Sequence, residues 1–187
     1  IMLRNEADAP ITLGAGRNGN LFANPYTGAV AEPGAQGLHR FFDADHRRLD
    51  ALLVRATGDA DRVDLALFGE FRAGLLKHIG MEEKILFPAA RAKGADPRFF
   101  ARLRVDHGAI ASLLVPTPTR EIVGRIVSVL GPHNRREEEP DGAYEICDAA
   151  AGRAEVERLL GRLRVFRKSG SGTTGMVPRS SDISRST

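Results

Sequence analysis

The sequence predicts an all-α protein, an up-down-up-down antiparallel four-helix bundle with an irregular N-terminal arm and an extra C-terminal helix. Apolar residues recur in steps of three and four along four long stretches, as they do on helices packed in a bundle. No stretch alternates apolar and polar residues for long enough to indicate a β-strand. The connections between the stretches are short, and short connections make neighbouring helices antiparallel.

The first helix is expected over residues 36–56. It follows a segment, residues 1–35, that is rich in Gly, Pro, Asn and Ala and without a sustained period, which predicts an irregular arm. Gly58 follows the helix as a candidate C-terminal cap. One stripe of the helix advances in steps of three and four: His39, Phe42, His46, Leu49, Leu53 and Ala56.

The second helix is expected over residues 61–91. Asp61 is of a residue type that caps helix N-termini. Pro88 is expected to bend or end the helix, because proline lacks a backbone donor and clashes with the preceding turn. The stripe of this helix keeps its register through two polar residues, His78 and Glu82: Phe68, Phe71, Leu75, His78, Glu82 and Ile85.

The third and fourth helices have recognisable start signals. Asp96 and Pro97 form an N-cap followed by proline at the first helical position. The fourth helix is expected to begin around Thr119, and Pro132 is expected to cause a kink in it. Their stripes again include one histidine each: Phe100, Leu103, His107, Ile110 and Leu114, then Ile122, Ile126, Val129 and His133.

Four segments are expected along the chain. The N-terminal arm, residues 1–35, precedes the four-helix bundle, residues 36–145. An additional helical segment follows over residues 146–168, and the spacing of apolar residues near it predicts one or two short helices. Residues 169–187 are rich in Ser, Gly, Thr and Arg, which predicts a flexible basic tail.

Four of the five histidines follow a repeated plan, with one on each predicted helix, and two of these four have a glutamate four residues later. Residues at i and i+4 share a helical face about 6 Å apart. A buried carboxylate without a partner costs several kcal/mol or takes up a proton, so carboxylates in apolar stripes indicate a cation. If both glutamates were instead exposed and paired with Arg or Lys, the repeated spacing would have no explanation. The six candidate ligands are His46, His78, Glu82, His107, His133 and Glu137.

This ligand set exceeds what one tetrahedral zinc ion needs and suits two ions that share carboxylate bridges. Imidazole and carboxylate ligands with open positions point to iron, with manganese and zinc as alternatives. The single cysteine, Cys147, lies outside the expected bundle, which argues against an iron–sulfur cluster.

The pattern of one His, then His-x-x-x-Glu, twice over about residues 36–145, resembles the hemerythrin-like (HHE cation-binding) domain. The resemblance implies a four-helix bundle around a non-haem, oxo- or hydroxo-bridged di-iron centre. It also implies that Glu82 and Glu137 bridge the two iron ions. The four histidines would then be terminal ligands: His46, His78, His107 and His133.

Two departures separate this sequence from the oxygen-carrying hemerythrins. Those proteins have His-x-x-x-His on the third helix, whereas Leu103 and Ala111 stand four residues before and after His107 here. They also have His-x-x-x-x-Asp on the fourth helix, whereas this chain has His133-x-x-x-Glu137. The sequence is therefore similar to a bacterial hemerythrin-like subgroup, which implies reaction with O2, peroxide or nitric oxide rather than oxygen storage.

Two functions follow as hypotheses. The first is a di-iron protein that binds or consumes a small diatomic ligand or peroxide, and the second is an oxygen- or iron-sensing or metal-binding interaction module without turnover. The third helix is poor in ligands and leaves coordination positions open, which favours the first hypothesis. The long arm and the basic tail favour the second, and the sequence leaves open whether the protein is an enzyme.

Two further residues are candidates for the surroundings of the metal site. His39 lies seven residues before His46, about 10.5 Å along a straight helix, which is too far to share an ion with it. We expect the ring of His39 to contact the ligand residues without binding the metal, or to gate the pocket that leads to it. Tyr144 is a candidate proton or electron donor to the cavity, with packing in the core or on the surface as the alternative.

The carboxylates beside the candidate ligands are expected to be peripheral. Glu83 and Glu138 point about 100° away from the ligand glutamates that precede them, so we expect both on solvated faces. Asp45 and Asp106, which precede two of the histidines, are expected to face solvent or residues that surround the metal ligands.

Composition narrows the location and the partners. The net charge of +3 is carried by residues 167–187, where Arg167, Lys168, Arg179 and Arg185 outnumber Asp182, so the remainder is neutral and nucleic acid is a disfavoured partner. No apolar run approaches the ~18 residues of a membrane span. One cysteine and no visible secretory signal predict a cytoplasmic protein. The oligomeric state stays open.

Overall fold

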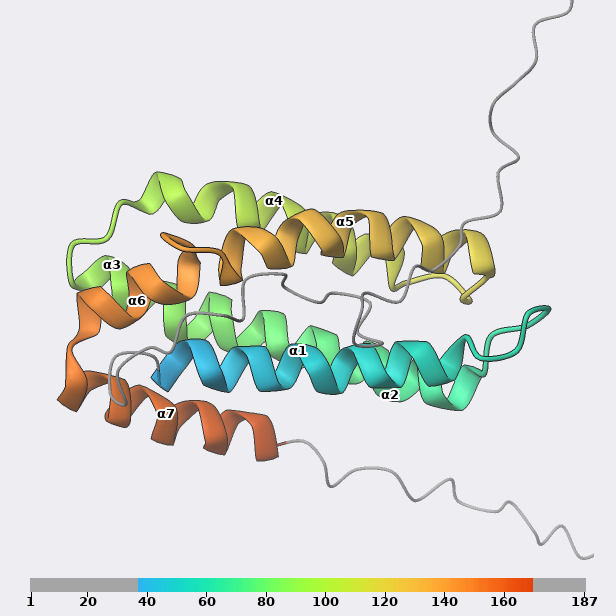
Figure 1. The fold of residues 1–187 in the computed structure, drawn as a ribbon, viewed down its shortest axis with the longest axis horizontal. Coiled ribbons are helices and arrows are strands. Elements are labelled where there is room, and N and C mark those ends of the chain that lie inside the picture. The colour runs from blue at the N-terminus through green and yellow to red at the C-terminus, as the bar shows by residue number, and fades with distance from the viewer. Residues whose placement is uncertain (1–36, 170–187) are drawn as a thin grey trace, which may run out of the picture.

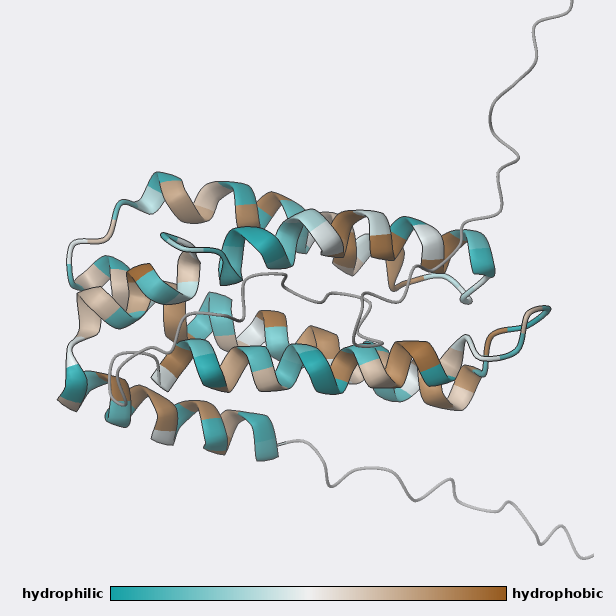
Figure 2. Cartoon of the chain, in the orientation of Figure 1, coloured by the Kyte–Doolittle hydropathy of each residue, from teal (hydrophilic) through white to brown (hydrophobic). Residues whose placement is uncertain are grey.

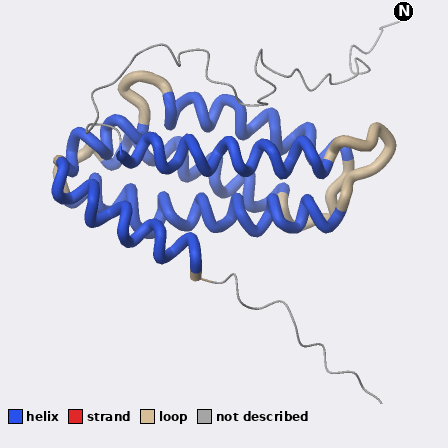
Figure 3. Tube along the Cα trace, turned by 60° about the horizontal axis from the view of Figure 1, so that its bottom comes forward, coloured by secondary structure: helices blue, strands red, loops and turns tan. Residues whose placement is uncertain are grey.

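The computed structural model describes residues 37–169, which form helices and short connections (Figures 1 and 3). The expected N-terminal arm, residues 1–35, lies outside the described residues, as does the expected tail from residue 170 onward. Over residues 37–169 the structure contains no strand, so the prediction of an all-α protein is confirmed.

Four long helices lie side by side as the bundle, and shorter elements extend it or cover one end (Figure 1). The elements are α1 (Gly37–Ala56), α2 (Leu65–Met81), the π-helical turn η1 (Glu82–Leu86), α3 (Phe87–Ala92), α4 (Pro97–Leu113), α5 (Arg120–Glu138), α6 (Ala143–Ala151) and α7 (Arg153–Lys168). The closely packed pairs within the bundle are α1 with α2 and α4 with α5, while α7 packs on α1 and α2. Polar and apolar residues alternate around these helices, as expected for a bundle (Figure 2).

The second helix begins three residues later than the sequence suggested. Asp64, not Asp61, is its N-cap, and the Asp64 carboxylate accepts hydrogen bonds from the backbone N–H groups of Ala66 and Leu67 at 2.9 and 3.0 Å. The backbone N–H of Asp61 is instead bonded to the Asp59 carboxylate at 2.9 Å. That local bond holds the chain in a turn, which delays the helix to the next aspartate.

The helical run does not end at Pro88. The five residues before α3 form the π-helical turn η1, closed by a hydrogen bond from the Phe87 N–H to the Glu82 carbonyl oxygen. Pro88 then lies in the first turn of α3, where its missing N–H is tolerated. The wider turn separates the proline ring from the carbonyl groups it would meet in an α-helix, and it begins at Glu82.

The other start signals are confirmed. Asp96 caps α4 through the Arg98 N–H at 2.9 Å, with Pro97 as the first helical residue. The hydroxyl of Thr119 caps α5 by accepting from the Ile122 N–H at 3.2 Å. Pro132 lies inside α5, which continues through it as one helix to Glu138.

Two hydrophobic clusters fill the interior at opposite ends of the bundle. One includes Phe42, Phe87, Phe100 and residues of α6 and α7, and the other gathers around Phe71. On α1, α2 and α4 the stripe passes from one cluster through a histidine to the other, and on α5 it passes from the Phe71 cluster to His133 and Glu137. The polar residues of the stripes therefore form a single layer between two apolar blocks.

Candidate metal centre

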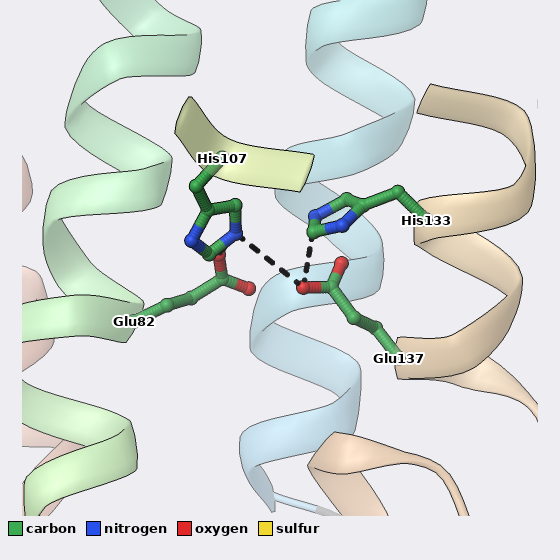
Figure 4. Close-up of side chains that lie close together, drawn as sticks. All are labelled: Glu82, His107, His133 and Glu137. Carbon is green, nitrogen blue, oxygen red and sulfur yellow. Dashed lines mark ion pairs between the residues drawn. The ribbon is translucent and has the colours of Figure 1, made fainter. Parts of the chain in front are cut away.

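The polar layer brings all six candidate ligands together, and each of them is buried. Their donor atoms form two groups in which every atom lies within 4.8 Å of the others. One group contains Glu82, His107, His133 and Glu137, which project toward one point from η1, α4 and α5 (Figure 4). The other contains His46, His78 and again Glu137. We call the first group the His107–His133 half and the second group the His46–His78 half.

Glu82 divides its two oxygens between the halves. Its Oε1 lies 3.3 Å from Nε2 of His78, and its Oε2 lies 3.2 Å from Nε2 of His107. A carboxylate whose oxygens face different groups of imidazoles has the arrangement that a bridge between two ions requires.

Glu137 divides its oxygens in the same way. Its Oε1 lies 3.1 Å from Nε2 of His133 and 3.9 Å from Nε2 of His107. Its Oε2 faces the other half, 3.6 Å from Nε2 of His46. The two glutamates thus connect the four histidines in pairs, although they come from helices 55 residues apart in the chain (137 − 82).

The site contains buried polar atoms that lack hydrogen bonds. Among the described residues, Glu82 Oε2, Glu137 Oε1 and His107 Nε2 are inaccessible and have no hydrogen-bond partner. All three belong to the His107–His133 half. Buried acceptors are costly unless something compensates them, and a cation between them would do so. The residues present therefore fit a bound metal ion.

The second ring nitrogen of each histidine faces another carboxylate. Nδ1 of His78 lies 3.1 Å from Asp45, and Nδ1 of His107 lies 2.9 Å from Glu83. Nδ1 of His46 is hydrogen-bonded to Glu138. Such partners fix the imidazole with a proton on Nδ1 and leave Nε2 free to bind a metal.

The fourth histidine has a weaker partner of this kind. Nδ1 of His133 lies 3.7 Å from Asp106, which is too long for a hydrogen bond. The same carboxylate oxygen of Asp106 accepts from Arg136 at 2.6 Å. The guanidinium of Arg136 thus competes for the oxygen that faces His133.

The expectation that Glu83 and Glu138 lie on solvated faces is wrong. Glu138 is buried and Glu83 half-buried, because each points into the space between its own helix and the next one rather than outward. The signal was present in the sequence, since both ligand glutamates are followed by a second glutamate and two histidines are preceded by an aspartate. Asp45 and Asp106 are both buried and face ligand histidines rather than solvent.

The electrostatics of the layer couple histidines to glutamates. Burial alone would lower the pKa of His78, but the charge of Glu82 and the hydrogen bond to Asp45 outweigh it and raise that pKa to about 10. The pKa of His107 is raised as well, since Glu82 outweighs the effect of burial. Burial would raise the pKa of Glu82, yet His78 and His107 bring it well below its ordinary value. Without a metal, protons on imidazole balance the carboxylate charge.

Tyr144 reaches the site from α6. Its ring is fully buried and its hydroxyl donates to Oε1 of Glu82 at 2.7 Å. Of the two positions that the sequence left open for this residue, the structure favours the cavity. His39 joins neither group of donor atoms; its half-buried ring lies 6.0 Å from the ring of Tyr144, centroid to centroid.

Comparison with known proteins identifies the family of this chain. The model of the hemerythrin HHE cation-binding domain matches residues 38–140, which include all six candidate ligands. The chain belongs to the hemerythrin HHE cation-binding family. No curated protein and no solved structure gives a significant match.

The family match separates two parts of this HHE protein. The helices that carry the six candidate ligands fall within it, whereas α6, α7 and therefore Tyr144 lie beyond its end. As a cation-binding HHE domain, the chain has two groups of buried His and Glu side chains that can hold metal. Between residues 37 and 169, no helix has the length and apolar character needed to cross a membrane.

Proposed function

We propose that this HHE protein holds two iron ions, one in each half, bridged by Glu82 and Glu137, and that it binds or consumes O2, peroxide or nitric oxide there. The observation that carries the proposal is the division of each glutamate's oxygens between the two halves. The pattern of the bacterial subgroup, with its ligand-poor third helix, supports small-molecule reactivity over oxygen storage. Manganese and zinc are the alternative metals.

The bound ions would supply Lewis acidity and electrons. The residues of the chain have other tasks. The six ligands would hold the ions, with Nε2 of each histidine as the donor atom. Asp45, Glu83 and Glu138 hold the rings of three histidines in orientation through Nδ1. The two hydrophobic clusters close the layer on both sides and limit the access of water.

A metal count on bridge variants tests the metal site. Chelator-washed protein is loaded with Fe(II) without oxygen, desalted and analysed for iron per chain. We expect two ions in the wild type and fewer in Glu137→Gln, because Glu137 belongs to both groups. The matched control is Glu139→Gln, a half-exposed carboxylate two positions later, which should keep both ions. A folded wild-type protein that binds no iron would refute the proposal.

Turnover separates the enzyme from the sensing module. The initial rate of peroxide consumption is measured for the loaded wild type and for His133→Ala, which removes one donor of the His107–His133 half. An enzyme should consume peroxide faster in the wild type. Equal background rates in both proteins, with the metal still bound in the wild type, would favour the sensing or binding module.

A further inference from the structure

The hydroxyl oxygen of Tyr144 sits among the donor atoms of the His46–His78 half. It lies 2.7 Å from Glu82 Oε1 and 3.2 Å from Glu137 Oε2. It lies 3.4 Å from Nε2 of His46 and 3.4 Å from Nε2 of His78. A hydrogen bond to Glu82 alone would not require closeness to the other three atoms.

The distances match those between neighbouring donors on one metal ion. Ligand atoms about 2.1 Å from an ion and at right angles to one another are about 3 Å apart. In this half, Nε2 of His46 and Nε2 of His78 are 2.9 Å apart, and each lies 3.3–3.6 Å from its neighbouring glutamate oxygen. The Tyr144 oxygen, at 2.7–3.4 Å from all four, extends this set.

We propose that Tyr144 is a fifth protein donor of the His46–His78 half and binds its metal ion as a phenolate. This inference rests on the proposed function. It assigns a ligand that lies outside the region matched by the family model, since the match ends at residue 140. When the ion binds, the Tyr144 oxygen gains a bond to the metal, and the proton it now donates to Glu82 is released to solvent.

The aromatic surroundings hold the phenol in place. The ring of Tyr144 stacks on Phe42, with centroids 4.7 Å apart and planes 12° from parallel. Phe42 in turn packs edge-on against the ring of His78, at 5.3 Å and 88°. Both Phe42 and Tyr144 are fully buried, so the phenol oxygen has a fixed position relative to the imidazole beside it.

The proposal makes the two halves unequal. The His46–His78 half would have five protein donors, whereas the His107–His133 half has its two imidazoles and two shared carboxylates. The three buried ligand atoms without a hydrogen bond also lie in the His107–His133 half. An O2, peroxide or nitric oxide molecule would therefore bind to the ion of the His107–His133 half, where coordination positions remain open.

The test is the resonance Raman spectrum of the ferric protein. A phenolate bound to Fe(III) gives a visible charge-transfer absorption, and excitation into it enhances the ring vibrations of the bound tyrosine. The chain has two tyrosines, so Tyr26→Phe leaves Tyr144 as the remaining candidate. We expect the tyrosinate bands in the wild type and in Tyr26→Phe, and their loss in Tyr144→Phe.

The outcomes are distinguishable. Tyrosinate bands that persist in Tyr26→Phe support the proposal even if Tyr144→Phe does not fold. Iron-loaded wild type without these bands, or bands that vanish in Tyr26→Phe, would overturn the role of Tyr144 and leave the di-iron centre standing. A wild type that takes up no iron would instead refute the proposed function, which the metal count measures separately.

Discussion

Each histidine of the centre has two different neighbours, a ligand glutamate at Nε2 and a second carboxylate near Nδ1. The contact between Nδ1 of His46 and Glu138 joins the end of α5 to α1. Carboxylates in this position fix the tautomer and increase the basicity of the imidazole, so they act on a metal without touching it.

We therefore expect Glu138→Gln to weaken metal binding by about 10- to 100-fold while the fold is kept. The amide can still accept from Nδ1 but carries no charge. Affinity is measured by competition with a chromophoric chelator, and helix content by circular dichroism. Glu139→Gln is the matched control and should bind metal like the wild type. Equal affinity of both variants would contradict the role of Glu138.

The raised pKa of His78 predicts a pH dependence of metal binding. A metal ion binds the neutral imidazole, whereas His78, with a pKa of about 10 in the metal-free protein, carries a proton at neutral pH. Binding must displace that proton, so affinity should rise with pH, by about tenfold per pH unit for each proton displaced. Zinc affinity measured from pH 6 to 8 checks this expectation, and a constant affinity would exclude proton displacement.

Among the elements, α6 depends on the turn that leads into it. Gly142 precedes α6, and a Cβ on it would lie 2.6, 2.7 and 2.9 Å from the carbonyl oxygens of Glu139, Glu137 and Arg136. Only a residue without a side chain allows the chain to turn so tightly. This turn fixes where Tyr144 enters the centre.

Gly142→Ala should lower the free energy of unfolding by about 1–3 kcal/mol, because the backbone must shift to make room for the methyl group. The control is Gly161→Ala on the exposed face of α7, where a Cβ meets nothing within 4 Å and alanine favours the helix. Urea unfolding of both variants gives the comparison. Two variants as stable as the wild type would show that the turn can relax.

The elements also show what the sequence could predict and what it could not. The start signal at Asp96 was sufficient, because a capping side chain acts on its own helix. The start at Asp64 was missed because two aspartates compete, and a local bond at Asp59 decides between them. The π-helical turn before Pro88 depends on how the whole helix fits the bundle, which spacing within one helix does not contain.

The six candidate ligands followed from the stripes, since residues four apart on one helix must share a face. The roles of Glu83 and Glu138 could not be predicted in this way. A residue that points 100° away from the ligand face is buried only if a neighbouring helix packs against that side. Here Glu83 of η1 meets His107 of α4, and that contact belongs to the packing of two helices. The position of Tyr144 likewise depends on the turn before α6.

For the whole molecule, the two hydrophobic clusters predict how it responds to metal removal. Both clusters pack without any of the six His and Glu ligands, so chelated protein should keep its helix content. It should unfold at a lower temperature than the loaded protein, because ligands that bind the native state stabilise it. Circular dichroism during heating, with and without chelator, tests both parts. Loss of helix content on chelation at room temperature would show that the two clusters alone do not keep the metal-free protein folded.

The carboxylates at Nδ1 of the histidines relate the two helical hairpins of the bundle to each other. Asp45 is hydrogen-bonded to His78 within the first hairpin, which α1, α2 and η1 form. Glu83 of this hairpin is hydrogen-bonded to His107 of the second hairpin, which α4 and α5 form, and Glu138 of the second hairpin is hydrogen-bonded to His46 of the first. The first hairpin thus provides a carboxylate for His78 but none for Nδ1 of His46, whereas two copies of this hairpin around a two-fold axis would provide one for every imidazole. The chain thus has the plan of a homodimer joined by a linker. Tyr144 breaks its symmetry, since Ala89 stands at the same distance after Glu82 as Tyr144 does after Glu137.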